Sequence, residues 1–249
     1  RWDVKRPFRQ LVTSATYRQA AVTTPEKVAA DRDNRLLSRG PRFRMDAEMI
    51  RDQALAASGL LVRKIGGPSV KPYQPDGVWS AVAMPESNTK KYVPGSGDDL
   101  YRRSLYWFWK RSAPPASLDI FNAPSREVCV VRRDRTNTPL QALVSLNDPQ
   151  FVEAARVLAD TAVAHSGNDG VRLDFVSRRL LARPLETDER ELALATLAEL
   201  AGHYAAAPAD AAQLVAVGES KPRSADVPTL AAWTMLVNEL MNLDEFLCK

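Results

Sequence analysis

The stretch TPLQALVSLNDPQFVEAARVLADTAVAH, residues 138–165, decides the fold class of this 249-residue chain. Thr138 is a natural helix N-cap, and Pro139 suits the first helical position because its φ is fixed. Gln141 at the third position completes a Thr-x-x-Gln capping box. The opening of the stretch therefore predicts a helix that begins at residue 139.

The same stretch starts a second helix a few residues later. Asp148 is the expected N-cap and Pro149 the expected first helical residue. Apolar residues then recur at helical spacing on one face: Phe151, Ala155, Leu158 and Ala162. Similar stripes follow to the C-terminus, so residues 138–249 are predicted to be helix after helix.

The first half of the chain is more irregular. We expect helices over residues 43–61 and 100–111, a helical turn at 77–82, and one strand, REVCVVRR, at 126–133. Residues 64–97 hold five prolines and five glycines and form a long loop. The predicted fold is mainly α: an irregular helical domain with long Pro/Gly-rich loops and at most a small β element.

Charge divides the chain into two halves. Residues 1–135 hold 25 Lys and Arg against 14 Asp and Glu, and residues 136–249 hold 9 against 16. We interpret residues 1–249 as one domain with a basic, loop-rich half and an acidic, helical half. The chain opens in mid-pattern without Met, which indicates a domain that is incomplete at its N-terminus.

Several chemistries lack their usual signatures. The nucleophile-elbow, phosphate-loop and dinucleotide-binding motifs are absent, as is the haem-attachment motif. The two histidines, His165 and His203, each end an alanine-rich helix, so we predict no metal site. Cys129 is expected to be a small buried hydrophobic residue, and a disulfide to Cys248 stays open. No apolar run is long enough to span a membrane.

The segment before the first predicted capping box is the best candidate for a binding site. Capping does not explain its polar side chains, which lie just before a helix N-terminus: Arg126, Arg132, Arg133, Arg135 and Asn137. Free backbone N–H groups and guanidinium groups together suit an anion or a carboxylate. The carboxylate could belong to a ligand or partner, or to the chain itself, for example Glu127 or Asp134.

Two other patterns allow a functional and a structural interpretation. The acids Asp119, Glu127 and Asp134 could serve glycosidase-type acid–base chemistry, or they could pair with the neighbouring arginines. The aromatic run YWFWKR, residues 106–111, could stack on a carbohydrate or partner. Core packing is the simpler interpretation of that run, with Trp107 or Trp109 facing outward.

The residues also resemble a known family. The motifs TSATYRQ, NRLLSRGPRFRMDAEMIRDQALAASGLL, GGPSVKPYQP, YRRSLYWFWKR, FNAPSREVCVVRRDRTNTPLQAL and LNDPQFVEAAR occur in order, and NLDEFL closes the chain. Together they are similar to the planctomycete domain of unknown function that lies C-terminal to cytochrome-c-like domains. The resemblance implies an exported, extracytoplasmic multidomain protein, with no cofactor in this chain and haem on a separate upstream domain. Relatives often carry Asp where this chain has Asn122.

These observations favour a binding or scaffolding module in an exported, possibly redox-linked polypeptide over an enzyme. Its expected partners are other domains of the same polypeptide, or an acidic ligand or polysaccharide. A hydrolase acting on extracellular polysaccharide is the alternative, which Asn122 weakens because a carboxylate is lost there. Nucleic-acid binding by the basic half is the second alternative, but the chain has no dense basic tract or known nucleic-acid signature.

Overall fold

The computed structural model describes residues 2–248 and divides the chain into two compact units. The smaller unit consists of residues 1–44 with 248–249, and the larger of residues 45–247. The chain is mainly α, as predicted. In the described residues, β structure is limited to isolated bridges between single residues.

The smaller unit contains α1 (Lys5–Thr13) and α2 (Pro25–Ala30). Thr24 caps α2, because its hydroxyl accepts a hydrogen bond from the Lys27 N–H at 3.3 Å. The turn after α2 is held by polar groups. Asp31 accepts from the N–H groups of Arg35 and Leu36, both at 2.8 Å. This unit owes its local shape to capping and turn contacts, since neither of its helices buries a residue.

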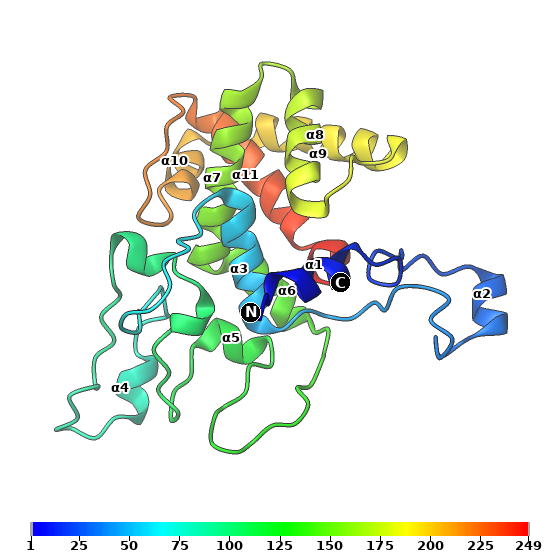
Figure 1. The fold of residues 1–249 in the computed structure, drawn as a ribbon. Coiled ribbons are helices and arrows are strands. Elements are labelled where there is room, and N and C mark those ends of the chain that lie inside the picture. Colours follow the sequence, from blue (N-terminus) through cyan, green and yellow to red (C-terminus); the bar gives the residue numbers. More distant parts are fainter. Residues whose placement is uncertain (1, 249) are drawn as a thin grey trace. The chain divides into compact units, whose positions relative to one another are not determined.

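The larger unit carries the other helices (Figure 1): α3 (Ala47–Ser58), α4 (Val78–Val82), η1 (Gly97–Leu100), η2 (Ser104–Tyr106), α5 (Ala116–Ile120), α6 (Pro139–Asn147), α7 (Pro149–His165), α8 (Asp169–Leu181), α9 (Thr187–Ala206), α10 (Pro208–Val215), α11 (Val227–Met241) and α12 (Asp244–Leu247). The helix starts expected at Pro139 and Pro149 are confirmed. Thr138 and Asp148 cap them by accepting from the N–H groups of Gln141 and Gln150.

Two central helices, α7 and α11, pack along each other and organise the core. The predicted stripe on α7 is buried, because Phe151, Ala155, Leu158 and Ala162 are at most 3% exposed. Helices α9 and α10 pack on α11, and α3 packs on α7. The small alanine side chains of α7 allow neighbouring helices to approach closely, and α7 is therefore buried on almost every side.

The helix predicted over residues 100–111 is wrong. Only the short 3-10 turns η1 and η2 form in this region. The backbone instead pairs with residues 62–70: the Val62 N–H donates to the Tyr101 carbonyl at 3.0 Å, and the Phe108 N–H donates to the Val70 carbonyl at 2.8 Å. Tertiary pairing therefore overrides the local helical pattern.

In the aromatic run, Trp107 is buried and Trp109 is partly buried. Trp107 lies in the core cluster, and Trp109 packs against it. Trp109 is therefore the more exposed of the two tryptophans, although one side of it packs against the core. The guanidinium of Arg51 lies over the Trp107 ring, 5.1 Å from its centroid.

The strand predicted at residues 126–133 is also wrong, because this segment is irregular and exposed. None of the described β-bridges includes residues 126–133, so the segment has no strand partner. Cys129 lies in it as an exposed free thiol, which corrects the expectation of a buried residue. At the start of the larger unit, Met49 is half-exposed, whereas Met45, Ile50 and Leu55 are buried.

A buried guanidinium joins α3 to α7 and to the segment around η1 and η2. Arg51 is 2% exposed and donates to the Gln150 side chain and to the carbonyls of Leu100 and Arg102. Its Nη1 also lies 3.2 Å from the Ser104 hydroxyl. One side chain therefore fixes three parts of the larger unit.

We predict that Arg51→Met destabilises the protein by roughly 3–5 kcal/mol, because buried acceptors would lose their charged donor. Urea unfolding followed by circular dichroism measures this change. Arg63→Met is the matched control, since Arg63 is exposed, and it should change stability by less than about 0.5 kcal/mol. Equal stability of the two variants would contradict the role assigned to Arg51.

Candidate functional site

The predicted arginines lie in an irregular segment between α5 and α6, residues 125–137, which we name the arginine loop. Every residue of the loop is exposed except Arg133, which is partly buried. Arg126 has a left-handed backbone with φ of 65°. The loop is therefore a surface feature whose geometry depends on the side chains that hold its ends.

Aromatic and ionic contacts hold the first end of the loop. The Trp109 indole N–H donates to the Ser125 carbonyl at 3.1 Å. The Arg126 guanidinium lies over the Trp109 ring, with its central carbon 4.7 Å from the ring centroid. Glu127 is 3.6 Å from Arg111, and both side chains are more than half exposed. Arg126 and Glu127 thus act as anchors in this structure.

A bidentate ion pair holds the second end. Arg133 donates from Nη1 and Nη2 to the two carboxylate oxygens of Glu48, at 2.5 and 3.1 Å. Asp46 lies 3.7 Å from the same guanidinium. Hydrogen bonding to Glu48 raises the pKa of Arg133 above its ordinary value. Arg133, one of the predicted binding residues, therefore forms an ion pair within the chain, with Glu48 at the start of α3.

The middle of the loop carries side chains without such anchors. Arg132 and Asp134 are exposed, and neither makes a hydrogen bond or ion pair within residues 2–248. Arg135 and Asn137 are also exposed. A surface hollow of about 430 Å³ is lined by the four residues 132–135. Of the five predicted binding residues, Arg132 is thus the one that lies exposed between the two fixed ends.

The three candidate acids are spread over different surroundings. Asp119 lies exposed on α5, Glu127 is paired with Arg111, and Asp134 lines the hollow of the arginine loop. The lining of that hollow includes neither Asp119 nor Glu127. Asn122 donates to the Thr136 hydroxyl at 2.7 Å. These positions provide no shared cleft with two facing carboxylates.

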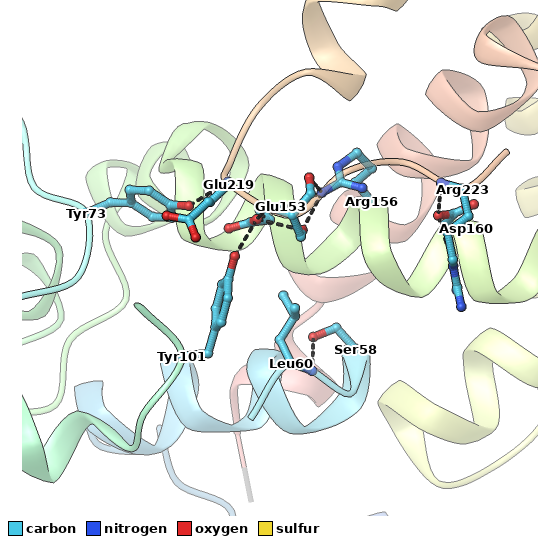
Figure 2. Close-up of polar contacts among 10 residues, drawn as sticks. Ser58, Leu60, Tyr73, Tyr101, Glu153, Arg156, Asp160, Glu219 and Arg223 are labelled. Carbon is cyan, nitrogen blue, oxygen red and sulfur yellow. Dashed lines mark hydrogen bonds and ion pairs between the residues drawn. The ribbon is translucent and has the colours of Figure 1, made fainter. Parts of the chain in front are cut away.

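Sequence reasoning missed a buried polar cluster on α7, which Figure 2 shows. Glu153 is fully buried, and its Oε1 accepts hydrogen bonds from the Tyr101 hydroxyl at 2.8 Å and from the Ser220 N–H and hydroxyl at 2.7 Å. Arg156 is fully buried as well, and it donates to the Ser220 carbonyl at 2.6 Å. The Glu219 N–H donates to the Tyr73 hydroxyl at 2.7 Å.

A second contact of the same kind lies about two turns along α7 from Glu153. Asp160 accepts from the backbone N–H groups of Arg223 and Ser224, at 2.8 and 3.0 Å (Figure 2). The charged residues of α7 therefore hold the connector between α10 and α11, residues 216–226. The backbone of this connector donates to the carboxylates of Glu153 and Asp160 on α7. One pattern in the sequence could have indicated these contacts: three charged residues, at 153, 156 and 160, lie on one face of an otherwise apolar helix.

The cluster is closed to ligands. A Cβ added at Gly218 would lie 2.2 Å from Cδ of Glu153, so the connector backbone fills the space above the carboxylate. Gly218 also has φ of 89°, a conformation that favours glycine. Burial raises the pKa of Tyr101 to about 12, assisted by its hydrogen bond to Glu153. Burial and the Glu153 charge also raise the pKa of Tyr73. The cluster therefore joins chain segments and is not a substrate site.

We predict that stability falls as the pH rises from 10 to 12. The folded state holds the Tyr101 proton more tightly than the unfolded state, so its contribution is full below pH 10 and is lost as the pH approaches 12. Urea midpoints measured between pH 9 and 12 should fall less steeply in Tyr101→Phe than in the wild type. The exposed Tyr17→Phe is the control and should keep the wild-type slope. An unchanged slope in Tyr101→Phe would refute the assignment.

Residues 2–248 offer neither a cluster of metal ligands nor a helix suited to a membrane. That part of the chain holds no group of three or more His, Cys, Asp or Glu side chains arranged to bind a metal ion. None of its helices combines the length and apolar character that crossing a membrane requires. His165 stacks on Phe175 at 4.7 Å between ring centroids, and His203 packs against Tyr204.

Comparison with known proteins gives a family and no further relative. Searches of curated proteins and of solved structures found no match. Residues 1–197 match the family PSD1, described as a protein of unknown function (DUF1553). This match agrees with the resemblance seen in the sequence and spans most of the chain. The chain therefore belongs to the PSD1 family of proteins of unknown function, DUF1553.

Proposed function

We propose that this domain is a non-catalytic binding module whose arginine loop binds an acidic protein partner. The observation that carries the proposal is the state of Arg132: it is exposed and has no partner within residues 2–248, while both ends of its loop are anchored. An anchored loop loses little conformational entropy on binding, so its free groups are suited to recognition.

The side chains beside Arg132 support a protein as the partner. Val128 is 70% exposed and Val131 is fully exposed, next to a row of charged residues. Apolar side chains flanked by arginine are typical of protein interfaces, where arginine is enriched. Guanidinium groups pair with carboxylates in bidentate geometry, so the complementary surface is acidic. Another domain of the same polypeptide is the partner that we favour.

The probe for this site is a poly-L-glutamate peptide of about 20 residues, titrated against the whole chain at two salt concentrations. We expect binding that weakens with salt, and Arg132→Glu should weaken it roughly five-fold or more. Arg103→Glu makes the same change of charge at an exposed arginine outside the loop, so it is the matched control. Its affinity should stay close to that of the wild type.

The alternatives give different outcomes. Equal losses in both variants would show that net charge alone drives binding and would refute the assigned site. Tighter binding to a 20-base-pair duplex than to poly-L-glutamate would favour the nucleic-acid alternative. Release of reducing ends from a soluble polysaccharide, abolished by Asp134→Asn, would favour the hydrolase.

We further propose that the module works outside the cytoplasm in an exported, redox-linked polypeptide of planctomycete type. The support is the order of the motifs that resemble the domain found beside cytochrome-c-like domains. In this proposal, haem is carried by a separate upstream domain, and the module positions that domain or its partner.

Cell fractionation tests the location. An antibody raised against residues 45–247 should detect the native protein in an extracytoplasmic fraction, because an exported polypeptide accumulates there. Haem staining of the same band on a gel should be positive if a haem domain belongs to the chain. Detection only in the cytoplasmic fraction, beside a cytoplasmic marker, would contradict the proposal.

A further inference from the structure

A second candidate site lies in the larger unit, away from the anchors of the arginine loop. A pocket of about 490 Å³ is formed by α5, α6, the start of α7 and the segments at residues 73–75 and 94. Its walls are almost entirely apolar, and the side chains that matter here are Tyr73, Pro94, Ile120, Leu143, Val144 and Pro149. A pocket of this size accommodates one large apolar side chain with its backbone.

The walls are held by contacts that point away from the pocket. The Tyr73 hydroxyl accepts from the Glu219 N–H and lies beside the Glu153 cluster, as Figure 2 shows, so its ring is fixed. The Ile120 carbonyl accepts from the Gln141 side chain at 3.0 Å, which ties α5 to α6. The pocket is therefore formed before any ligand arrives.

Four polar side chains interrupt the apolar lining: Gln74, Ser117, Asn147 and Asp148. The Asn147 amide donates to the Leu143 carbonyl at 2.8 Å, and the Ser117 side chain hydrogen-bonds to Asp148, so Gln74 and Asp148 are the groups that bear on a ligand. The Gln74 side-chain nitrogen is buried and has no hydrogen-bond partner within residues 2–248. Asp148 also lines the pocket, and its Oδ1 accepts from the Gln150 N–H at 2.9 Å. Burial raises the pKa of Asp148 above its ordinary value, against the lowering effect of the Arg51 guanidinium. A buried amide donor without a partner is a group that a ligand would satisfy.

These two groups define the chemistry of the ligand. The Gln74 amide calls for an acceptor, and the Asp148 carboxylate calls for a donor. A ligand carboxylate is disfavoured beside Asp148, and a cation is disfavoured by the buried guanidinium of Arg51. A neutral peptide unit offers one acceptor and one donor next to an apolar side chain.

We propose that this pocket binds a peptide segment, with an apolar side chain of leucine size inside it. The peptide carbonyl accepts from Gln74, and the peptide N–H donates to Asp148. The inference goes beyond the proposed function, because it assigns a separate site that uses none of the residues of the arginine loop.

The test uses three small probes on the whole chain, each titrated by NMR. N-acetyl-leucinamide carries the apolar side chain and neutral peptide units, N-acetyl-leucine adds a carboxylate, and 3-methyl-1-butanol keeps only the apolar part with a hydroxyl. We expect about millimolar affinity for the first probe, as is usual for a ligand of this size. The other two should bind roughly five-fold more weakly, because N-acetyl-leucine places a carboxylate beside Asp148 and the alcohol lacks the peptide unit.

Variants then locate the binding. Leu143→Trp fills the pocket and should abolish binding of N-acetyl-leucinamide. Leu140→Trp is the matched control on α6, because Leu140 is equally exposed but does not line the pocket. Gln74→Met should weaken the amide about five-fold and leave the alcohol unchanged. Asp148→Asn keeps a good N-cap for α7 and should raise the affinity for N-acetyl-leucine.

Three outcomes would overturn the proposal. Equal affinity for the alcohol and the amide would make the pocket a simple apolar cavity. Loss of binding in both tryptophan variants, or in neither, would place the probe elsewhere. An unchanged affinity of Gln74→Met for the amide would remove the hydrogen bond on which the peptide assignment rests.

Discussion

The buried guanidinium of Arg51 holds together the parts of the larger unit that have no regular structure. Burial lowers the pKa of Arg51 to about 10, so the group is still charged at neutral pH. Removing a charge from water is costly, and only a full set of acceptors offsets that cost. The carbonyls of Leu100 and Arg102 and the Gln150 side chain supply them. The segment around η1 and η2 is thereby fixed against α3 and α7.

The same solution recurs in two other places where the chain runs without regular structure. Arg102 is 3% exposed and donates to the carbonyls of Pro68 and Gly66 at 2.9 and 2.5 Å. On α7, Glu153 and Asp160 accept from the backbone of the connector at 216–226. Buried backbone groups must be paired, and in this fold charged side chains replace the missing sheet partners. The buried arginines Arg51 and Arg102 therefore have a structural role.

Features that depend on neighbouring residues could be predicted from the sequence, whereas features that depend on distant contacts could not. The starts of α6 and α7 depend on neighbouring residues, Thr138 with Pro139 and Asp148 with Pro149, so local chemistry was sufficient. The helix expected over residues 100–111 failed because its backbone pairs with residues 62–70, about 40 positions away. The partner of Glu153 lies 67 positions along the chain, at Ser220, which no local pattern reveals. The anchors of the arginine loop on α3 and Trp109 are likewise contacts between distant segments.

Most of the arginines described above have partners within the chain, and this sets Arg132 apart. In the core, a guanidinium is surrounded by acceptors, as Arg51 and Arg102 are. At the ends of the arginine loop, Arg126 and Arg133 lie on an aromatic ring and a carboxylate of the chain itself. Arg132 departs from this pattern, because it is exposed without a partner in residues 2–248 and stands next to the fully exposed Val131. Exposure of an apolar side chain to water is unfavourable. An acidic partner with an apolar contact would bury Val131 and pair a carboxylate with Arg132.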